Sequence, residues 1–275
     1  MNFIDLFSGC GGLSLGLLNA GLNGVLAIEK NVDAFATLKK NLLENPDSGR
    51  KSFSWDEDNI PQIPHDINEL VNSHVYISYL KKLGVEKSID LIVGGPPCQG
   101  FSLAGKRDPD DPRNQLVGAY LKVVGMIMPK YLLMENVKGI NLKFKKNSKE
   151  LSMAEKIKID LRDMGYVTVS LLENSKSWGV PQSRTRFLLL GIRKDLFNSG
   201  YELKYIEDKL LTFVKQEIDD SSKRFREGKN LPYPVSVGNA ISDLKICNSP
   251  DFKELVPASD APGKLFKQLK SLNQK

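Results

Sequence analysis

A cysteine near the middle of this 275-residue chain follows an apolar segment that ends abruptly. Residues 89–93 are Ile-Asp-Leu-Ile-Val, two glycines and two prolines come next, and Cys98 follows them. An apolar run of this length bounded by breakers indicates a buried parallel strand. Because open α/β sheets keep their chemistry beyond the carboxyl ends of their strands, Cys98 is a candidate nucleophile. The alternative is a small apolar residue at a strand end, the commonest role of a free cysteine.

Charged side chains stand at two further strand boundaries. Residues 131–134 form a short apolar run that ends at Glu135, where partial desolvation would raise the carboxyl pKa and suit it to donate a proton. A capping or salt-bridged carboxylate is the alternative. Arg184 and Arg186 precede the apolar run 187–192, and their i, i+2 spacing at the entry to a strand points both guanidiniums to one face. Guanidinium planes suit bidentate contacts with base edges or phosphates.

The N-terminal segment has the pattern of a nucleoside-binding unit. An apolar strand at 2–7 is followed by Ser-Gly-Cys-Gly-Gly at 8–12 and an apolar helix from 13. Strand, glycine turn and helix open a Rossmann-type unit, in which the glycines let the backbone approach a ligand. A second strand at 24–28 ends in Glu29, where such folds place a carboxylate for ribose hydroxyls. A helix-packing turn beside a surface glutamate is the alternative.

The elements that would position these residues alternate along the chain. Helices are predicted at 32–43, 71–83, 116–128 and 154–164, a further strand at 167–172, and a polar surface excursion at 46–64. Alternating strands and helices predict an α/β fold with a mostly parallel sheet and helices on both faces. We place a catalytic domain at residues 1–194. Residues 195–275 are expected to form a connector and the start of a smaller, incomplete second domain.

Composition narrows the class of protein. The chain is 41% hydrophobic and 26% charged, as in soluble globular proteins, with no apolar run of membrane-spanning length and no secretory leader. We therefore expect no membrane association. The three cysteines are widely spaced, which fits a reducing compartment and offers no zinc-type pair, so we also expect no metal. Residues 101–150 hold ten Lys or Arg against five Asp or Glu, within a total net charge of +6. That excess suits nucleic acid, and it equally suits a solvated basic face.

Taken together, these motifs resemble those of bacterial-type DNA cytosine-5 methyltransferases. They are Asp-Leu-Phe-Ser-Gly-Cys-Gly-Gly at 5–12, Asp-Ile at 66–67, Pro-Cys-Gln at 97–99, Glu-Asn-Val at 135–137, and Gly-Val-Pro-Gln-Ser-Arg-Thr-Arg at 179–186. The resemblance covers about the first 245 residues. It implies a Rossmann-like, class I S-adenosylmethionine-dependent methyltransferase fold in the bacterial cytoplasm, serving DNA methylation in a restriction-modification system.

The resemblance also implies a reaction and its residues. Cys98 would add to C6 of a cytosine flipped out of double-stranded DNA, Glu135 would protonate or hydrogen-bond N3, and Arg186, supported by Arg184, would hold the base. S-adenosylmethionine would supply the methyl group and leave as S-adenosylhomocysteine. The implied cofactor-binding residues are Phe7, Gly9, Cys10, Gly11, Gly12, Glu29, Lys30, Asp66, Ile67, Pro97 and Leu116. The implied DNA-binding residues are Gln99, Ser102, Lys106, Arg107, Arg113 and Gln182, several of them in a candidate lid at 103–113.

The end of the chain departs from the pattern. Full-length members continue with a target-recognition region and two further motifs, and none is recognisable between residues 244 and 275. We therefore expect a truncated product or one subunit of a split enzyme, weak or inactive until a second polypeptide supplies the remainder.

Two other functions fit parts of the sequence. A related branch methylates cytosine in tRNA, but it usually carries a threonine-containing sequence after its Pro-Cys, where this chain has Gln-Gly-Phe-Ser at 99–102. A non-catalytic relic that binds cofactor or DNA is the second alternative. The presence of both Cys98 and Glu135 argues against it.

Overall fold

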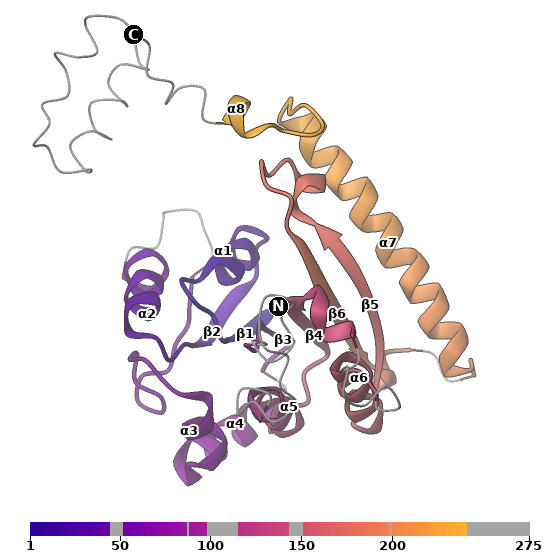
Figure 1. The fold of residues 1–275 in the computed structure, drawn as a ribbon. Helices are drawn as coiled ribbons and strands as arrows, with labels where there is room; N and C mark the ends of the chain where they lie inside the picture. The colour runs from indigo at the N-terminus through magenta and orange to yellow at the C-terminus, as the bar shows by residue number, and fades with distance from the viewer. Residues whose placement is uncertain (45–51, 87, 98–114, 143–150, 198–199, 241–275) are drawn as a thin grey trace, which may run out of the picture. The chain divides into compact units, whose positions relative to one another are not determined.

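A six-stranded, mostly parallel sheet forms the centre of the part of the chain described here (Figure 1). The computed structural model describes residues 1–44, 52–86, 88–97, 115–142, 151–197 and 200–240. The strands are β1 (Asn2–Leu6), β2 (Asn23–Ile28), β3 (Leu91–Gly94), β4 (Tyr131–Val137), β5 (Tyr166–Asn174) and β6 (Thr185–Arg193), in the order β2-β1-β3-β4-β6-β5. β1 pairs in parallel with β2 and β3, β3 pairs in parallel with β4, and β6 runs antiparallel to β4. The carboxyl ends of four strands therefore meet at one edge of the sheet.

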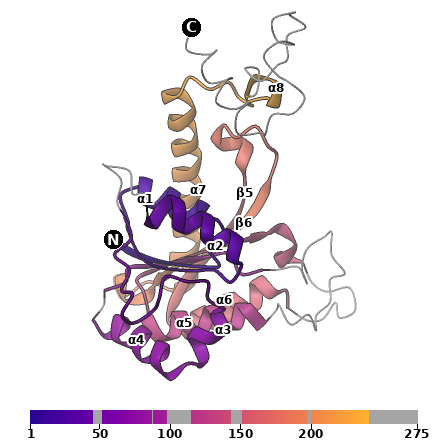
Figure 2. The same cartoon turned by 90° about the vertical axis from the view of Figure 1, so that its left-hand side faces the viewer.

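Helices cover both faces of this sheet, as the sequence predicts (Figure 2). The helices are α1 (Gly12–Asn19), α2 (Val32–Leu38), which continues as a π-helical segment at Lys39–Leu43, α3 (Ile67–Asn72), α4 (His74–Val85), α5 (Gln115–Ile127), α6 (Met153–Asp163), α7 (Leu203–Gly228) and α8 (Val237–Ala240). α1 and α2 lie on one face, and α3 to α6 lie on the other. The single helix predicted at 71–83 is wrong, because the extended backbone of Ser73 separates α3 from α4.

Two clusters of buried apolar side chains lie between the sheet and its helices. Residues that alternate along a strand belong to different clusters. Phe3 belongs to the cluster with Leu18 and Leu38 from α1 and α2, whereas Ile4 and Leu6 belong to the cluster that includes α4 and α5 residues. Successive side chains of a strand point to opposite faces, so β1 buries apolar side chains on both sides. None of the described helices has the length and apolar character needed to cross a lipid bilayer.

The segment expected to be a polar surface excursion is partly core where it is described. Ile60 is fully buried, and the Trp55 Nε1 donates a hydrogen bond to its carbonyl at 2.6 Å. Phe53 forms an isolated bridge with Gly24, where a Cβ would stand 2.4 Å from the Phe53 ring. The surface prediction was wrong for these residues. Their apolar side chains are scattered among polar and breaker residues with no helical or strand periodicity, so nothing in the sequence indicates that they are buried.

The chain divides into two compact units. One comprises residues 1–173 and 185–218, and the other comprises residues 174–184 and 219–275. Within the described part of the second unit, the Arg226 guanidinium donates to the Ser177 carbonyl and lies 4.6 Å from the centre of the Tyr233 ring. The two-domain boundary expected after residue 194 stays a prediction.

Candidate active site

One row of residues across the sheet edge carries most of the candidate site. Ile28, Leu6, Gly94 and Met134 are neighbours in register across β2, β1, β3 and β4. The next residue in each case is Glu29, Phe7, Gly95 or Glu135. Parallel pairing therefore brings together residues that lie up to 128 positions apart, between Phe7 and Glu135.

Glu29 is held by backbone amides from two segments. Its Oε2 accepts from the Gly9 N–H at 2.8 Å, and its Oε1 accepts from the Asn31 N–H at 2.7 Å. The glycine turn needs its glycines, since Gly9 and Gly11 have φ of 55° and 84° and a Cβ on Gly11 would stand 2.7 Å from Leu42. Each carboxylate oxygen can accept a further hydrogen bond, so the Glu29 carboxylate suits a pair of ligand hydroxyls.

A buried carboxyl lies within β1, ahead of this turn. Asp5 is 1% exposed, and its Oδ2 accepts from the Ser14 hydroxyl at 2.6 Å. Its Oδ1 has no hydrogen-bond partner among the described residues. Burial, opposed in part by the hydrogen bonds from Ser14, raises the pKa of Asp5 to about 7. The Asp5 carboxyl therefore changes its charge near neutral pH.

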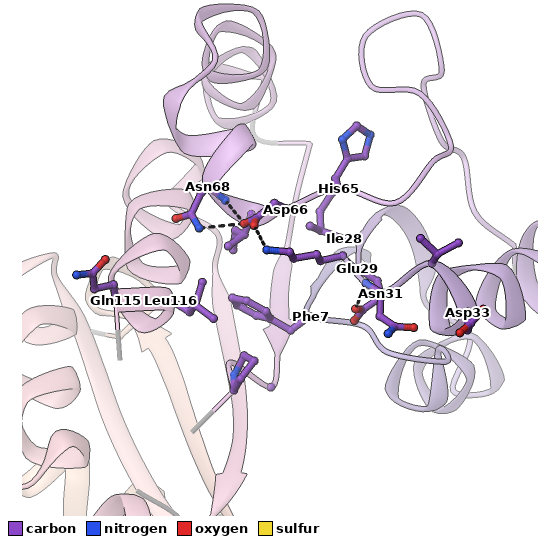
Figure 3. A pocket seen from close by; sticks show the side chains of 15 residues that line it. Phe7, Ile28, Glu29, Asn31, Asp33, His65, Asp66, Asn68, Gln115 and Leu116 are labelled. Carbon is purple, nitrogen blue, oxygen red and sulfur yellow. Dashed lines mark hydrogen bonds and ion pairs between the residues drawn. The ribbon is translucent and has the colours of Figure 1, made fainter. Parts of the chain in front are cut away.

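A cavity of about 900 Å³ opens beside this row (Figure 3). Its lining residues are Phe7, Ile28, Glu29, Lys30, Asn31, Val32, Asp33, His65, Asp66, Ile67, Asn68, Gly95, Pro97, Gln115 and Leu116. Phe7 holds a left-handed backbone with φ of 61°, which is uncommon for a residue other than glycine. The predicted cofactor residues Phe7, Glu29, Lys30, Asp66, Ile67, Pro97 and Leu116 are brought together here, whereas those of the glycine turn, residues 9–12, do not line the cavity.

Asp66 both caps a helix and forms an ion pair. As the N-cap of α3, its Oδ1 accepts from the backbone and side-chain N–H groups of Asn68, each at 2.9 Å. Its Oδ2 lies 2.6 Å from the Nζ of Lys30. Partial burial acts to raise the pKa of Asp66, but the hydrogen bonds from Lys30 and Asn68 outweigh it and hold that pKa below its usual range.

Glu135 forms an ion pair with Arg186 of the adjacent strand. The Arg186 Nε lies 2.6 Å from Oε1 of Glu135, and one Arg186 Nη donates to the Thr185 carbonyl at 2.9 Å. Oε2 faces Gly95, where an added Cβ would come within 3.2 Å of it. The salt-bridged carboxylate considered as an alternative is thus present. Proton donation by Glu135 stays a prediction.

Two residues of this site stand in motifs noted in the sequence but were given no role there. Asn136, only 2% exposed, donates from Nδ2 to the Pro96 carbonyl at 3.1 Å, and its Oδ1 accepts from the Val137 N–H. Gly95 lines the cavity, and a Cβ added to it would stand 3.2 Å from Oε2 of Glu135. The signals available were a polar residue inside a buried strand and a pair of glycines at a strand end. Neither reveals which distant residue it would meet.

Other predicted residues lie elsewhere. Cys98, Gln99, Ser102, Lys106, Arg107 and Arg113 fall outside the described residues. Gln182 and Arg184 belong to the second unit, where their carbonyls accept hydrogen bonds from the hydroxyl and the N–H of Ser175. The roles of these residues, and the convergence of Arg184 with Arg186, stay predictions.

The mostly parallel sheet, the glycine turn with its anchored carboxylate and the adjoining cavity define a Rossmann-like α/β fold with a candidate nucleoside site. The sequence matches the family model described as C-5 cytosine-specific DNA methylase over residues 1–260. The chain therefore belongs to the C-5 cytosine-specific DNA methylase family.

Individual relatives agree with this assignment. The chain is 38% identical over 195 residues to the type II methyltransferase M.DdeI of Desulfomicrobium norvegicum, a match covering 71% of this chain and 41% of M.DdeI. It is 38% identical over 194 residues to the type II methyltransferase M.AquIA of a Picosynechococcus species, covering 69% of this chain and 71% of that protein. A crystal structure described as a DNA modification methyltransferase encoded within a prophage (E. coli) superposes with a TM-score of 0.53 at 32% identity, covering 71% of this chain and 47% of that one. The chain thus spans about two fifths of the length of M.DdeI.

Proposed function

We propose that this chain binds S-adenosylmethionine in the cavity and transfers its methyl group to C5 of a cytosine in double-stranded DNA. The observation that carries the proposal is the position of Gly95, which lines the cavity and where an added Cβ would stand 3.2 Å from Oε2 of Glu135. A methyl donor in the cavity and a base held at Glu135 would therefore meet across one glycine.

The lining residues fit the donor. Glu29 offers one acceptor position on each anchored oxygen for ribose hydroxyls, and Phe7, Ile67 and Leu116 offer apolar surface to a flat ring. Asp66 offers an acceptor for an exocyclic amino group. When bound, S-adenosylmethionine supplies a methyl group on a positively charged sulfur, and it needs no phosphate site.

The chain's own residues would prepare the cytosine. The Cys98 thiolate forms a bond to C6, Glu135 gives a proton or a hydrogen bond to N3, and the displaced π electrons make C5 nucleophilic. C5 then takes the methyl group, loses its proton to a base, and the C6–S bond breaks as the ring recovers its double bond. The target cytosine must first be flipped out of the duplex, at a cost of a few kcal/mol.

Arg186 would hold both Glu135 and the target cytosine. A guanidinium has five N–H groups, of which one is directed at Glu135 and one at the Thr185 carbonyl. In the part of the chain that the structure describes, the remaining N–H groups have no hydrogen-bond partner, and they would contact the cytosine or a neighbouring phosphate. Basic residues between 101 and 150 would add sequence-independent attraction to DNA.

The relatives M.DdeI and M.AquIA are type II methyltransferases, so we further propose that this chain serves a restriction-modification system in a bacterial cytoplasm. We assign target recognition to residues outside the described part, either of this chain or of a second polypeptide.

The test measures binding first and then transfer. Calorimetry should show S-adenosylmethionine binding. Because the isolated chain is expected to be weak or inactive, transfer is measured with a candidate second polypeptide added, and radiolabelled methyl groups should then pass to duplex DNA rather than to tRNA. Glu135→Gln should abolish transfer while leaving binding intact. Glu86→Gln, an exposed carboxylate paired with Lys82 away from the cavity, is the matched control. No binding by the wild type, or transfer to tRNA alone, would overturn the proposal.

A covalent trap identifies the nucleophile separately. 5-Fluorocytosine carries fluorine in place of the C5 hydrogen. In duplex DNA incubated with S-adenosylmethionine, its C5 therefore has no proton to lose after methyl transfer, the C6–S bond cannot break, and the Cys98 adduct should persist as a species of increased mass. Cys98→Ala should form none, and an adduct that survives this substitution would contradict the assignment.

A further inference from the structure

Lys30 lines the cavity and forms an ion pair with Asp66. It follows β2, and its Nζ reaches Oδ2 of Asp66, 36 residues later at the start of α3, at 2.6 Å (Figure 3). Both residues line the cavity. The Lys30 side chain is 77% exposed, so the pair contributes little to the stability of the fold. Its consequence lies in what it does to Asp66.

The hydrogen bonds of Asp66 leave little room for a ligand. A carboxylate has about four acceptor positions, two on each oxygen. Asn68 occupies both positions of Oδ1, and Lys30 occupies one position of Oδ2. Among the described residues, Asp66 therefore retains one acceptor position, on the oxygen that Lys30 holds in place.

We propose that Lys30 is a positioning residue for nucleoside recognition, because its ion pair fixes the single remaining acceptor of Asp66 toward an exocyclic amino group of the bound base. The inference rests on the proposed binding of an adenosyl ligand in this cavity. It adds that the preference for an amino-bearing base depends on a residue that need not touch the base.

Two features of the site support this role. Asp66 is the N-cap of the short helix α3, and Asn68 alone fixes only one of the Asp66 carboxylate oxygens. Without Lys30, Oδ2 would be free to turn toward solvent, since the Asp66 side chain is 22% exposed. An oxygen that must be reoriented before binding contributes less affinity than one already in position.

A thermodynamic cycle between protein and ligand tests the inference. Calorimetry compares S-adenosylhomocysteine with its 6-deamino analogue, which has hydrogen in place of the amino group. The wild type should bind the amino ligand roughly 10-fold to 100-fold more tightly, because the analogue leaves the Asp66 acceptor unpaired. Lys30→Met should reduce this ratio to below about 3-fold by weakening the amino ligand alone, and Lys30→Arg should restore most of it.

Controls separate this outcome from others. Lys82→Met removes an exposed, ion-paired lysine on α4 outside the cavity and should leave the ratio unchanged. Equal weakening of both ligands by Lys30→Met, or a wild type without preference for the amino group, would overturn the inference while leaving the proposed function intact. A wild type that binds neither ligand would instead overturn the proposed function.

Discussion

The Arg186 Nε lies 2.6 Å from Oε1 of Glu135, across an antiparallel pair of strands that places Val137 opposite Arg186. The side chains are 22% and 38% exposed, respectively, so solvent still reaches the Glu135 carboxylate. The carboxylate is thus fixed from the β6 side before any base arrives.

Replacing Arg186 by lysine should separate catalysis from donor binding. A lysine ammonium can pair with Glu135, but it lacks the planar fork that also reaches the Thr185 carbonyl and a substrate. We expect kcat for methyl transfer to fall roughly 10²-fold, as on loss of one preorganised donor. The dissociation constant of S-adenosylhomocysteine should stay within about 3-fold. The matched control is Arg162→Lys, at an exposed pair with Glu207, and a similar loss in that variant would contradict the role of Arg186.

Asn136 should matter beyond its contribution to stability. Asn136→Ala leaves the Pro96 carbonyl without its donor, and the free energy of unfolding should fall by about 1–3 kcal/mol. Because Pro96 lies two residues before Cys98, transfer should fall further than the loss of folded protein explains. Ile157→Val, a core change expected to cost about 1 kcal/mol, serves as a stability reference. Equal residual activity per folded molecule in the two variants would argue against a positioning role.

Gly95 should not tolerate a side chain. A Cβ at this position would approach Oε2 of Glu135 to 3.2 Å, so Gly95→Ala should displace the carboxylate by a few tenths of an ångström. We expect the rate of transfer to fall at least 10-fold, because a small displacement of a reacting group raises the activation barrier. The melting temperature should change little. Gly118→Ala in α5, where nothing lies within 4 Å of the added Cβ, should leave activity unchanged. Full activity in the Gly95 variant would show that the position of the Glu135 carboxylate next to residue 95 does not matter for transfer.

Asp5 should make the stability of the fold depend on pH. Its pKa rises from 3.8 to about 7 on folding, so between these values the native state binds a proton that the unfolded state has lost. Stability should therefore fall as pH rises through this range, by about 2–3 kcal/mol between pH 5 and pH 8, and level off above it. Urea denaturation of the wild type and Asp5→Asn across this range measures the difference in slope. Parallel curves would show that Asp5 does not carry this dependence, whatever the absolute stability of the variant.

The sequence predicted the sheet edge well for a physical reason. Apolar runs that end in breakers locate strand ends, and parallel pairing then places Phe7, Glu29 and Glu135 in one row. The prediction of helices on both faces is also confirmed. Strands with apolar side chains on both sides need helices packed on both faces of the sheet.

Pairs that join distant segments could not be predicted. Nothing local to Lys30 or Asn136 specifies Asp66 or Pro96 as its partner, because hydrogen bonds between side chains and other segments depend on tertiary placement. Ser73, which separates two helices, also lacks a strong breaker such as proline or glycine beside it.

The left-handed backbone of Phe7 has a cost that the rest of the fold must offset. A conformation of this kind costs a non-glycine residue on the order of 1 kcal/mol, and a glycine there would avoid it. The chain nevertheless places an aromatic ring at the wall of the cavity. Random substitution at this position, sorted separately for thermal resistance and for ligand retention, should therefore enrich different residues, with glycine favoured only where retention is not demanded.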